Sequence, residues 1–258
     1  MKEKIKNILK LIGIGGLRSL LLTILRYPSF FLDLRRFIAL SKKSKEQRFS
    51  LEMTDLYPCV NDKTTSTGFD RHYVFHTAWA ARKVKKISPK VHYDLSSSLY
   101  FNAIVSAFVP IQFYDYRPAI LNLTGLLSGK GDLYKLPFED SSIDSLSCMH
   151  VVEHIGLGRY GDPVDYDGDL KAISEIKRVL SSGGNLLFVV PIGQNKIMYN
   201  AHRIYTYEQI ITLFSDLRLV EFSLVQDGIL GGTIIENANE DIANKQQYGC
   251  GMFWFKKT

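Results

Sequence analysis

The sequence has few cysteines and no cysteine motif. Its 258 residues include three, Cys59, Cys148 and Cys250, and none forms a CxxC pair. An odd number without such spacing argues against a disulfide-stapled secreted scaffold and suits a reducing compartment. Cys148 falls in an apolar stretch, where its position favours a small core residue over a nucleophile.

A long uncharged apolar run is also missing. Residues 1–50 alternate between apolar and cationic stretches, and Arg18, Arg26 and the Arg35–Arg36 pair interrupt them. No run reaches the about 18–20 residues that a bilayer span needs. The short runs, with no small-residue cleavage site after them, argue against a signal peptide. Two interpretations stay open: amphipathic helices lying peripherally on an anionic membrane face, or a helical cap packed on the domain with solvated charges.

The basic character of the chain is confined to its start. The formal net charge is +6, yet residues 1–50 hold twelve Lys and Arg against three Asp and Glu, so the remainder is mildly acidic. The charge balance therefore does not indicate a nucleic-acid partner. With 46% hydrophobic residues the chain can bury a good core. We expect a basic amphipathic helical extension over 1–50 and one α/β domain over 51–258, in the cytoplasm or at the inner membrane face.

The most informative stretch is Gly131–Pro191. An apolar strand candidate, Ile143–Met149, runs into the pentapeptide His150–His154, and a loop rich in Gly and Asp follows. A helical pattern, the Gly183-Gly184 turn and a second strand candidate, Leu186–Pro191, complete a βαβ unit, which predicts a parallel sheet. Ligands of such sheets bind beyond the carboxyl ends of the strands. The polar cluster after the first strand therefore lies where chemistry is expected.

Several motifs appear in a specific order: Asp132, Leu136-Pro137-Phe138-Glu139-Asp140, Ile143-Asp144, Glu153-His154-Ile155, Glu175, Arg178-Val179-Leu180 and Gly183-Gly184. This series resembles the central half of a class I S-adenosylmethionine (SAM)-dependent methyltransferase, and the resemblance extends from Val91 to the C-terminus. It implies a Rossmann-like α/β sheet, mostly parallel with an antiparallel last strand, and SAM as cofactor. The whole pattern also resembles uncharacterised bacterial proteins associated with cell-surface polysaccharide genes.

The resemblance also implies which residues bind the cofactor. A strand over Val91–Leu95 and a helix over Leu99–Phe108 flank a turn that is glycine-rich in the family but reads Ser96-Ser97-Ser98 here. A serine forced into a left-handed conformation costs about 1–2 kcal/mol. An acidic residue at the end of the strand Ile111–Tyr116 is the expected ribose ligand. The implied cofactor residues are Asp94, Ser96, Ser98, Asp115, Asp132, Leu133 and His150.

A metal site is a second prediction. His150, Glu153 and His154 have i, i+3, i+4 spacing, so on a helix they converge on one point, and His202 follows the next strand. This set suits Mn, Fe, Zn or Co. It resembles the E-x-x-E-H segment and later His of some metal-dependent O-methyltransferases, with His150 in place of the first Glu. The metal-free alternative makes His154 or His202 a general base for an acceptor hydroxyl.

Candidate acceptor contacts come from three segments. The loop over 156–168 exceeds the usual length of a connection, and a long loop in a compact domain is commonly functional. Its Arg159 can hold an acceptor phosphate or carboxylate and is also a candidate catalytic residue. A predicted helix over 69–86 carries two imidazoles four residues apart. The predicted substrate residues are His72, His76, Arg159, Tyr160, Asp162, Asn200 and Arg203. For each segment, the alternative is that these residues lie on the surface or form turns and do not contact a substrate.

These features favour SAM-dependent O-methylation of a hydroxylated, anionic small molecule or glycan, with a link to cell-surface polysaccharide biosynthesis. The alternative is a catalytically degenerate SAM fold that acts as a scaffold at a membrane-associated assembly. Methylation of nucleic acid is a third and weaker interpretation. No pattern in the sequence indicates which acceptor atom would be methylated or what the oligomeric state is.

Overall fold

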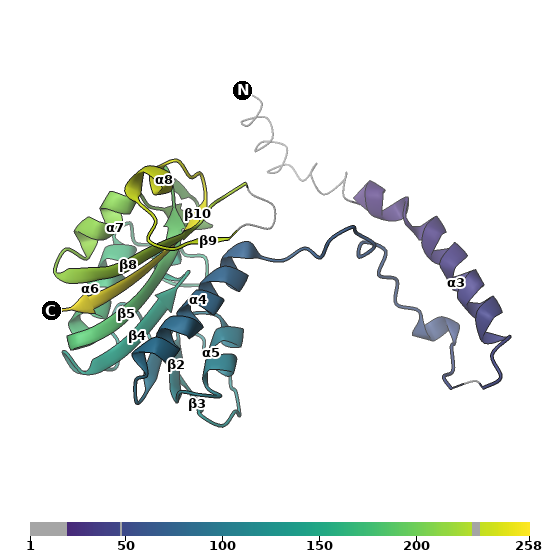
Figure 1. Cartoon of the computed structure of the whole chain (residues 1–258), viewed down its shortest axis with the longest axis horizontal. Coiled ribbons are helices and arrows are strands. Elements are labelled where there is room, and N and C mark those ends of the chain that lie inside the picture. The colour runs from purple at the N-terminus through teal and green to yellow at the C-terminus, as the bar shows by residue number, and fades with distance from the viewer. Residues whose placement is uncertain (1–19, 47, 229–232) are drawn as a thin grey trace. The chain divides into compact units, whose positions relative to one another are not determined.

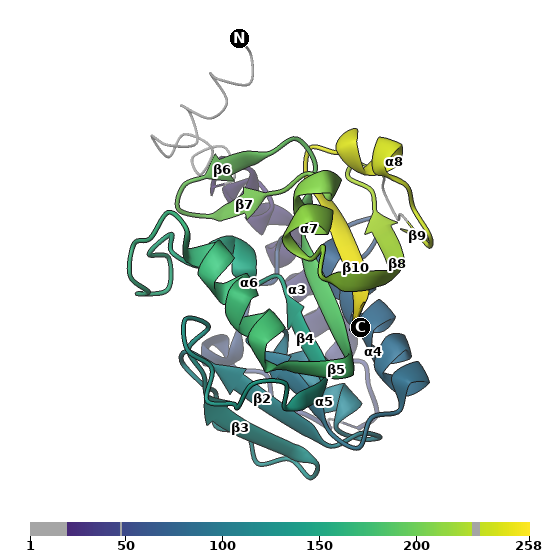
Figure 2. The same ribbon diagram turned by 90° about the vertical axis from the view of Figure 1, so that its left-hand side faces the viewer.

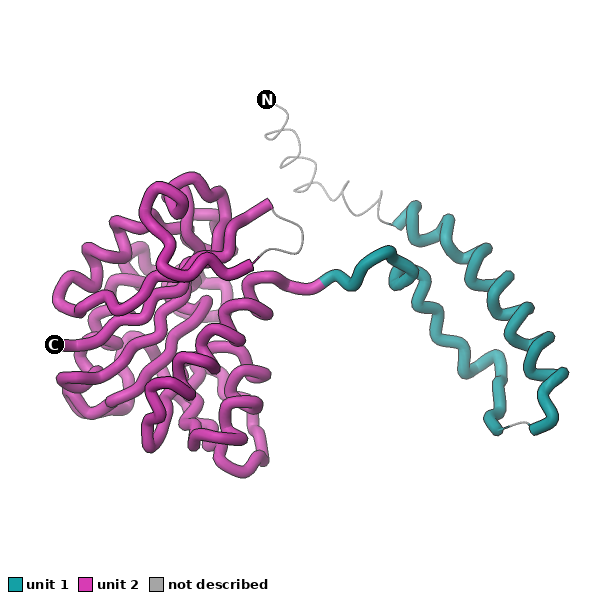
Figure 3. The backbone as a smooth tube through the Cα atoms, viewed as in Figure 1, with its two compact units in different colours: residues 1–68 teal, residues 69–258 magenta. Residues whose placement is uncertain are grey.

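A computed structural model describes residues 20–46, 48–228 and 233–258, and it divides the chain into two compact units, 1–68 and 69–258 (Figure 3). The predicted boundary lay after Ser50, so the polar segment 51–68 groups with the N-terminal unit. Among the described residues, no helix is long and apolar enough to cross a membrane. The predictions for residues 1–19 lie outside the described part of the chain.

The described part of the first unit includes the amphipathic helix α3 (Tyr27–Ser41) and a short 3₁₀ turn, η1 (Met53–Asp55). None of the residues of α3 is buried. Large apolar side chains along it, such as Leu32 and Phe37, are 66% and 60% exposed. The helix therefore offers an apolar surface that the described residues of its own unit leave open.

The second unit is an α/β domain around one eight-stranded sheet (Figure 1). The strand order across the sheet is β3-β2-β1-β4-β5-β10-β8-β9. The strands are β1 (His92–Leu95), β2 (Ile111–Asp115), β3 (Leu126–Lys130), β4 (Ile143–Met149), β5 (Leu180–Ile192), β8 (Leu217–Val225), β9 (Ile234–Ile235) and β10 (Gly249–Lys257). β1 to β5 run parallel, and β10 is antiparallel to both neighbours, β5 and β8. This is the predicted Rossmann-like sheet with an antiparallel last strand.

Helices cover both faces of the sheet (Figure 2). On one face, α4 (Arg71–Ile87) and α5 (Leu99–Val105) pack Trp79, Ala80 and Phe101 into one apolar core. On the other, α6 (Gly168–Val179) and α7 (Tyr207–Leu213) contribute to a second core. A hairpin of β6 (Lys196–Met198) and β7 (His202–Ile204) and a short helix, α8 (Glu240–Asn244), complete the unit. The result is a three-layer α/β/α sandwich.

The serine content of β4 has a structural reason. Ser145 and Ser147 lie on one face of the strand, and their hydroxyls bond both ring nitrogens of His92 on β1, at 2.8 and 2.9 Å. The His92 side chain is completely buried, and its burial lowers the pKa of the imidazole to about 3. The two hydroxyls therefore replace the water that a neutral imidazole would otherwise bond.

The fold positions the site through its strand order. β1 lies between β2 and β4, so the chain leaves β1 toward one side of the sheet and β4 toward the other. Such a topological switch opens a crevice beyond the carboxyl ends of these strands. Ser96 follows β1, Asp115 closes β2 and His150 follows β4, so all three stand at that crevice.

Local sequence signals placed several elements correctly. β4 has the predicted bounds. Thr206, a residue type that favours helix N-caps, caps α7 through reciprocal bonds with Gln209, at 3.1 and 2.9 Å. The predicted short helix at His150–His154 is instead a 3₁₀ turn, η2 (Val152–His154). His150 itself lies outside it, at a left-handed φ of 57°. β3 and the β6–β7 hairpin were not predicted, since both are short and their residues lack a strand pattern.

Candidate functional site

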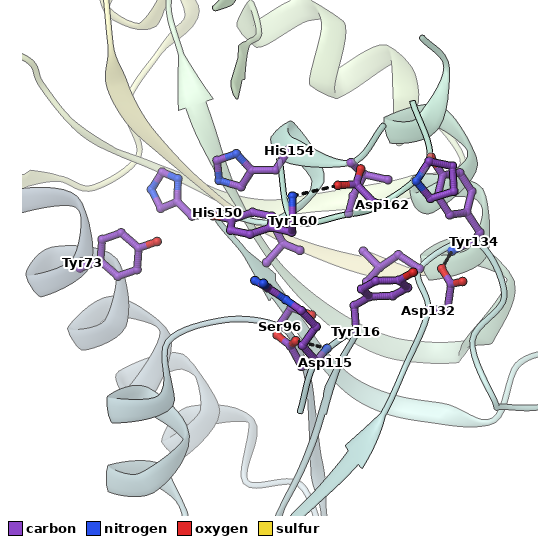
Figure 4. Close-up of a pocket in the computed structure, with 15 residues that line it drawn as sticks. Tyr73, Ser96, Asp115, Tyr116, Asp132, Tyr134, His150, His154, Tyr160 and Asp162 are labelled. Atoms are coloured by element: carbon purple, nitrogen blue, oxygen red, sulfur yellow. Dashed lines mark hydrogen bonds between the residues drawn. The ribbon is translucent and has the colours of Figure 1, made fainter. Parts of the chain in front are cut away.

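Two adjoining cavities lie beyond the carboxyl ends of the central strands. The first, of about 230 Å³, is lined by residues that include Ser96, Asp115, Asp132, Leu133 and Asp162 (Figure 4). The second, of about 650 Å³, is lined by residues that include Arg71, His72, Glu153, Arg159, His202 and Tyr248. Tyr73, His150, His154 and Tyr160 line both cavities. A molecule in the first cavity and one in the second would therefore meet at the same two imidazoles.

The serine turn leaves the first cavity open. Ser96 has a φ of 55°, the left-handed conformation that its place in the turn predicts. Its backbone N–H donates to the carbonyl oxygen of Tyr114 at 2.8 Å, and its hydroxyl donates to the same oxygen at 3.3 Å. Because the hydroxyl is held by the backbone of β2, the serine lines the cavity without plugging it.

Asp94 holds this turn and is not among the residues that line the cavity, so its role as a cofactor contact stays a prediction. Its carboxylate is fully buried and accepts hydrogen bonds from the backbone N–H of Ser97 at 3.1 Å and from the amide of Asn102 at 2.8 Å. The Ser147 hydroxyl donates to its other oxygen. Burial raises the pKa of Asp94 to about 6, and these donors oppose the rise. Ser98 also lies outside the lining, at the position preceding α5.

Two carboxylates that the sequence assigns to the cofactor, Asp115 and Asp132, line the first cavity. One oxygen of Asp115 accepts from the backbone N–H of Arg117 at 2.7 Å, and one oxygen of Asp132 accepts from that of Tyr134 at 2.9 Å. Each carboxylate is thus fixed through one oxygen. The buried side chain of Leu133 adds an apolar wall. An acidic strand end beside an apolar wall is the combination that ribose and adenine require.

His150 and Glu153 form a buried pair at the junction of the cavities. Nδ1 of His150 lies 2.8 Å from Oε1 of Glu153, and Nε2 lies 3.5 Å from Sγ of Cys250. Burial lowers the pKa of His150 to about 4 and raises that of Glu153 to about 7. Oε2 of Glu153 is buried and has no partner among the described residues. The carboxylate thus fixes the orientation of the His150 ring.

His154 has a defined tautomer. Its Nδ1 lies 2.6 Å from the backbone carbonyl oxygen of Ala201, so this nitrogen must carry the proton. Burial lowers the pKa of His154, which keeps the ring neutral near pH 7. Its Nε2 therefore holds a lone pair at the junction of the two cavities. His202 lies beside it, with a ring-centroid separation of 6.4 Å, and burial lowers the pKa of His202 as well.

The loop over 156–168 frames both cavities. Asp162 accepts from the backbone N–H groups of Gly156 at 2.7 Å and Tyr160 at 3.2 Å, so it shapes the loop in addition to lining the first cavity. Arg117 and Arg159 each place a guanidinium 5.0 Å from the centroid of the Tyr160 ring. These contacts hold the Tyr160 ring in place, where it forms part of the wall of both cavities.

Three predicted substrate residues do not reach the second cavity. His76 is completely buried, and its Nδ1 bonds the carbonyl oxygen of His72 at 2.6 Å. Arg203 is buried and donates to the carbonyl oxygens of Ile155 at 2.6 Å and Tyr166 at 2.9 Å, so it braces the loop. Asn200 is exposed and lines neither cavity. Substrate contacts by these three residues stay predictions; His72, Arg159 and Tyr160 do line the second cavity.

Sequence reasoning missed Arg71, Tyr248 and Cys250. Arg71 lines the second cavity, and its Nε and Nη2 are buried without a hydrogen-bond partner among the described residues. A cation in the first turn of a helix is unfavourable for the helix dipole, and this was the available signal. Tyr248 and Cys250 come from the start of β10 and its approach, where no motif marked them.

The predicted metal ligands do not group as expected. In residues 20–46, 48–228 and 233–258, one set of three potential ligands has its ligand atoms within 4.8 Å of one another: His72, His150 and Cys250. Glu153, His154 and His202 are not in that set, so the four-residue site remains a prediction.

A family model described as a Caenorhabditis protein of unknown function matches residues 137–229. No curated protein is similar in sequence to this chain.

Solved structures with a similar arrangement are SAM-dependent methyltransferases with varied substrates. One from Thermotoga maritima is 17% identical, with 72% of this chain and 92% of that chain covered and a TM-score of 0.46. The N-methyltransferase NodS from Bradyrhizobium japonicum, in complex with S-adenosylhomocysteine, is 14% identical, with coverages of 70% and 85% and a TM-score of 0.47. A 1,6-didemethyltoxoflavin N1-methyltransferase from Burkholderia thailandensis is 10% identical, with coverages of 71% and 79% and a TM-score of 0.47. At these values the similarity carries no statement about what this chain binds.

Proposed function

We propose that this protein is a SAM-dependent methyltransferase that transfers a methyl group to a hydroxyl of an anionic acceptor. The observation that carries the proposal is the pair of cavities that meet at His150 and His154. The first offers the carboxylates and apolar wall suited to a nucleoside. The second offers imidazoles and guanidinium groups.

The sulfonium of SAM is an activated donor, so the protein must chiefly align the acceptor and receive its proton. His154 is the proposed general base, because its Nδ1–H is committed to Ala201 and its Nε2 is available. In the transfer, the acceptor oxygen bonds the methyl carbon, the carbon–sulfur bond breaks, and S-adenosylhomocysteine leaves as a neutral thioether. The hydroxyl proton passes to Nε2 of His154.

An anionic acceptor is supported by Arg71 and Arg159. Two guanidinium nitrogens of Arg71, Nε and Nη2, are buried without a partner among the described residues. They would donate hydrogen bonds to the oxygens of a carboxylate or phosphate. Nη1 of Arg159 donates to the carbonyl oxygen of Ala201 at 3.0 Å, which holds the guanidinium beside the cavity. Its other N–H groups can donate to a bound anion. An acidic sugar or a phosphorylated glycan has both the hydroxyl and the charge, and a role in polysaccharide biosynthesis follows only as part of this proposal.

Calorimetry with SAM and S-adenosylhomocysteine tests the cofactor half of the proposal. Transfer of labelled methyl groups to a panel of acidic and neutral sugars tests the acceptor half. We expect saturable binding of both nucleosides and labelling of acidic acceptors. Folded protein that takes up neither nucleoside would contradict the proposal and favour the non-catalytic scaffold.

A further inference from the structure

The three potential ligands His72, His150 and Cys250 come from separate parts of the chain. His72 stands in the first turn of α4, His150 directly follows β4, and Cys250 lies in β10. Cys250 is held between Pro191 of β5 and Val225 of β8. Because the strands on both sides restrain the backbone of β10, the position of the Cys250 sulfur is well fixed. The imidazoles of His72 and His150 lie around it.

The distances within this cluster match a tetrahedral metal centre. Nε2 of His150 and Sγ of Cys250 are 3.5 Å apart, and the ligand atoms of all three residues lie within 4.8 Å. Zinc bonds of about 2.0 Å to nitrogen and 2.3 Å to sulfur at a tetrahedral angle would separate the two ligand atoms by about 3.5 Å. His150 and Cys250 therefore have the required spacing as they stand, and the His72 ligand atom lies within 4.8 Å of both.

The outer contacts of the cluster are those of a metal-binding histidine. Oε1 of Glu153 lies 2.8 Å from Nδ1 of His150, which leaves Nε2 facing the thiol. A carboxylate that fixes the second nitrogen of a histidine is the usual support for a zinc ligand. The His72 ring stacks between His150 and Tyr248, with centroid separations of 5.1 and 4.7 Å. His150 also adopts its left-handed φ here, a strained conformation that tends to be kept at functional positions.

We propose that His72, His150 and Cys250 bind one Zn²⁺ ion, with Glu153 as the positioning carboxylate and the fourth position directed to the second cavity. Two nitrogens and one sulfur with one open position form the donor set of catalytic rather than structural zinc. Binding releases the thiol proton of Cys250 to solvent as the sulfur–zinc bond forms. His72 and His150 line the second cavity, which gives the ion an entry path. That the open position receives the acceptor rests on the proposed function; the metal site itself does not.

The test uses the full chain, freed of metal by dialysis against a chelator and kept reduced. Zn²⁺ is then titrated against a chromophoric chelator, and Co²⁺ serves as the spectroscopic probe. Cys250→Ala removes the sulfur ligand, and Cys148→Ala is the matched control, because Cys148 is equally buried but belongs to the core on the opposite face. We expect the parent and the control to bind one equivalent, with a thiolate-to-cobalt charge-transfer band. Cys250→Ala should lose the band and at least about tenfold in affinity.

A second variant and a direct measurement keep the test independent of folding. His72→Ala changes a half-buried position and should weaken Zn²⁺ about tenfold while the charge-transfer band remains. X-ray absorption of the zinc-loaded parent should show one sulfur neighbour at about 2.3 Å. A cobalt spectrum without a thiolate band, or equal Zn²⁺ affinity in Cys250→Ala and the parent, would overturn the proposal and leave only a thiol–imidazole hydrogen bond. Calorimetry with SAM on the parent chain separates the two proposals, since a parent that binds SAM but no Zn²⁺ refutes the metal site alone.

Discussion

Nδ1 of His154 lies 2.6 Å from the carbonyl oxygen of Ala201, while its other ring nitrogen, Nε2, lies 3.8 Å from Oε1 of Glu153, and the residue lines both cavities. The hydrogen bond ties a residue that follows β4 to the tip of the β6–β7 hairpin, 47 positions away in the chain. The hairpin thus sets the tautomer of the proposed base.

If His154 is the base, His154→Gln should reduce methyl transfer by about 100-fold or more, since a positioned base contributes that much. Binding of S-adenosylhomocysteine should be unchanged within a factor of about two. Single-turnover transfer of labelled methyl groups and calorimetry provide the two measurements. Equal turnover in the variant and the parent would exclude His154 as the base.

Asp115 should contribute to nucleoside affinity. Asp115→Ala is expected to weaken S-adenosylhomocysteine by about 10- to 100-fold, the loss of a charge-assisted hydrogen bond of about 1.5–3 kcal/mol. Asp144→Ala is the control, because this exposed carboxylate sits at the start of β4, where it bonds Ser181. A similar affinity for both variants would mean that the nucleoside does not lie against β2.

The serine turn makes a prediction about stability. Ser96→Val places a β-branched side chain at a φ of 55° and should lower the free energy of unfolding by about 1–2 kcal/mol. Ser96→Gly should leave it nearly unchanged, because relief of the left-handed strain is offset by the entropy of glycine in the unfolded chain. Urea titrations measure both. A destabilised glycine variant would show that the Ser96 hydroxyl bond to Tyr114 matters more than the backbone conformation.

His92 should make folding acid-sensitive. Its pKa is about 3 in the folded chain against 6.5 unfolded, because burial disfavours the charged ring. The unfolded state therefore binds more protons between these values, and stability falls as the pH is lowered through 6.5 toward 3. From pH 7.5 to pH 5 this group alone should cost about 2 kcal/mol. Denaturant titrations of His92→Asn should show a pH dependence flatter by that amount, and an identical slope would refute the assignment.

The exposed apolar side of α3 and its neighbouring cations predict binding to anionic vesicles, a proposal carried over from the sequence. Arg35→Gln with Arg36→Gln should weaken co-sedimentation with phosphatidylglycerol vesicles by more than about tenfold, at about 1 kcal/mol for each charge. Lys85→Gln with Lys90→Gln, a pair of exposed cations in the second unit, is the control. Equal losses in both double variants would point to unspecific charge attraction.

The sequence predicted what local patterns determine. The bounds of β4 follow from adjacent residues, and the acidic strand end at Asp115 follows from strand polarity. The surroundings of Asp94 could not be predicted, because its donors Asn102 and Ser147 reach it only in the folded turn. A motif shows that an acid is present but does not show which groups surround it.

The cluster of His72, His150 and Cys250 could not be predicted for a different reason. Cys250 and His150 are 100 positions apart, and they meet because β10 enters the sheet between β5 and β8. No spacing rule encodes such an insertion. The predicted metal set used nearby residues instead, and the fold turned His154 toward the β6–β7 hairpin.

The position of β10 between β5 and β8 has a consequence for how the chain folds during synthesis. β8 is synthesised before β10 but contacts the parallel strands only through it, so its edge stays without a partner until Gly249–Lys257 has emerged from the ribosome. A nascent chain that stops short of this segment exposes two open strand edges, on β5 and on β8, which favour association with other chains. The addition of β10 therefore completes the sheet and, in the same step, brings the Cys250 sulfur next to His150.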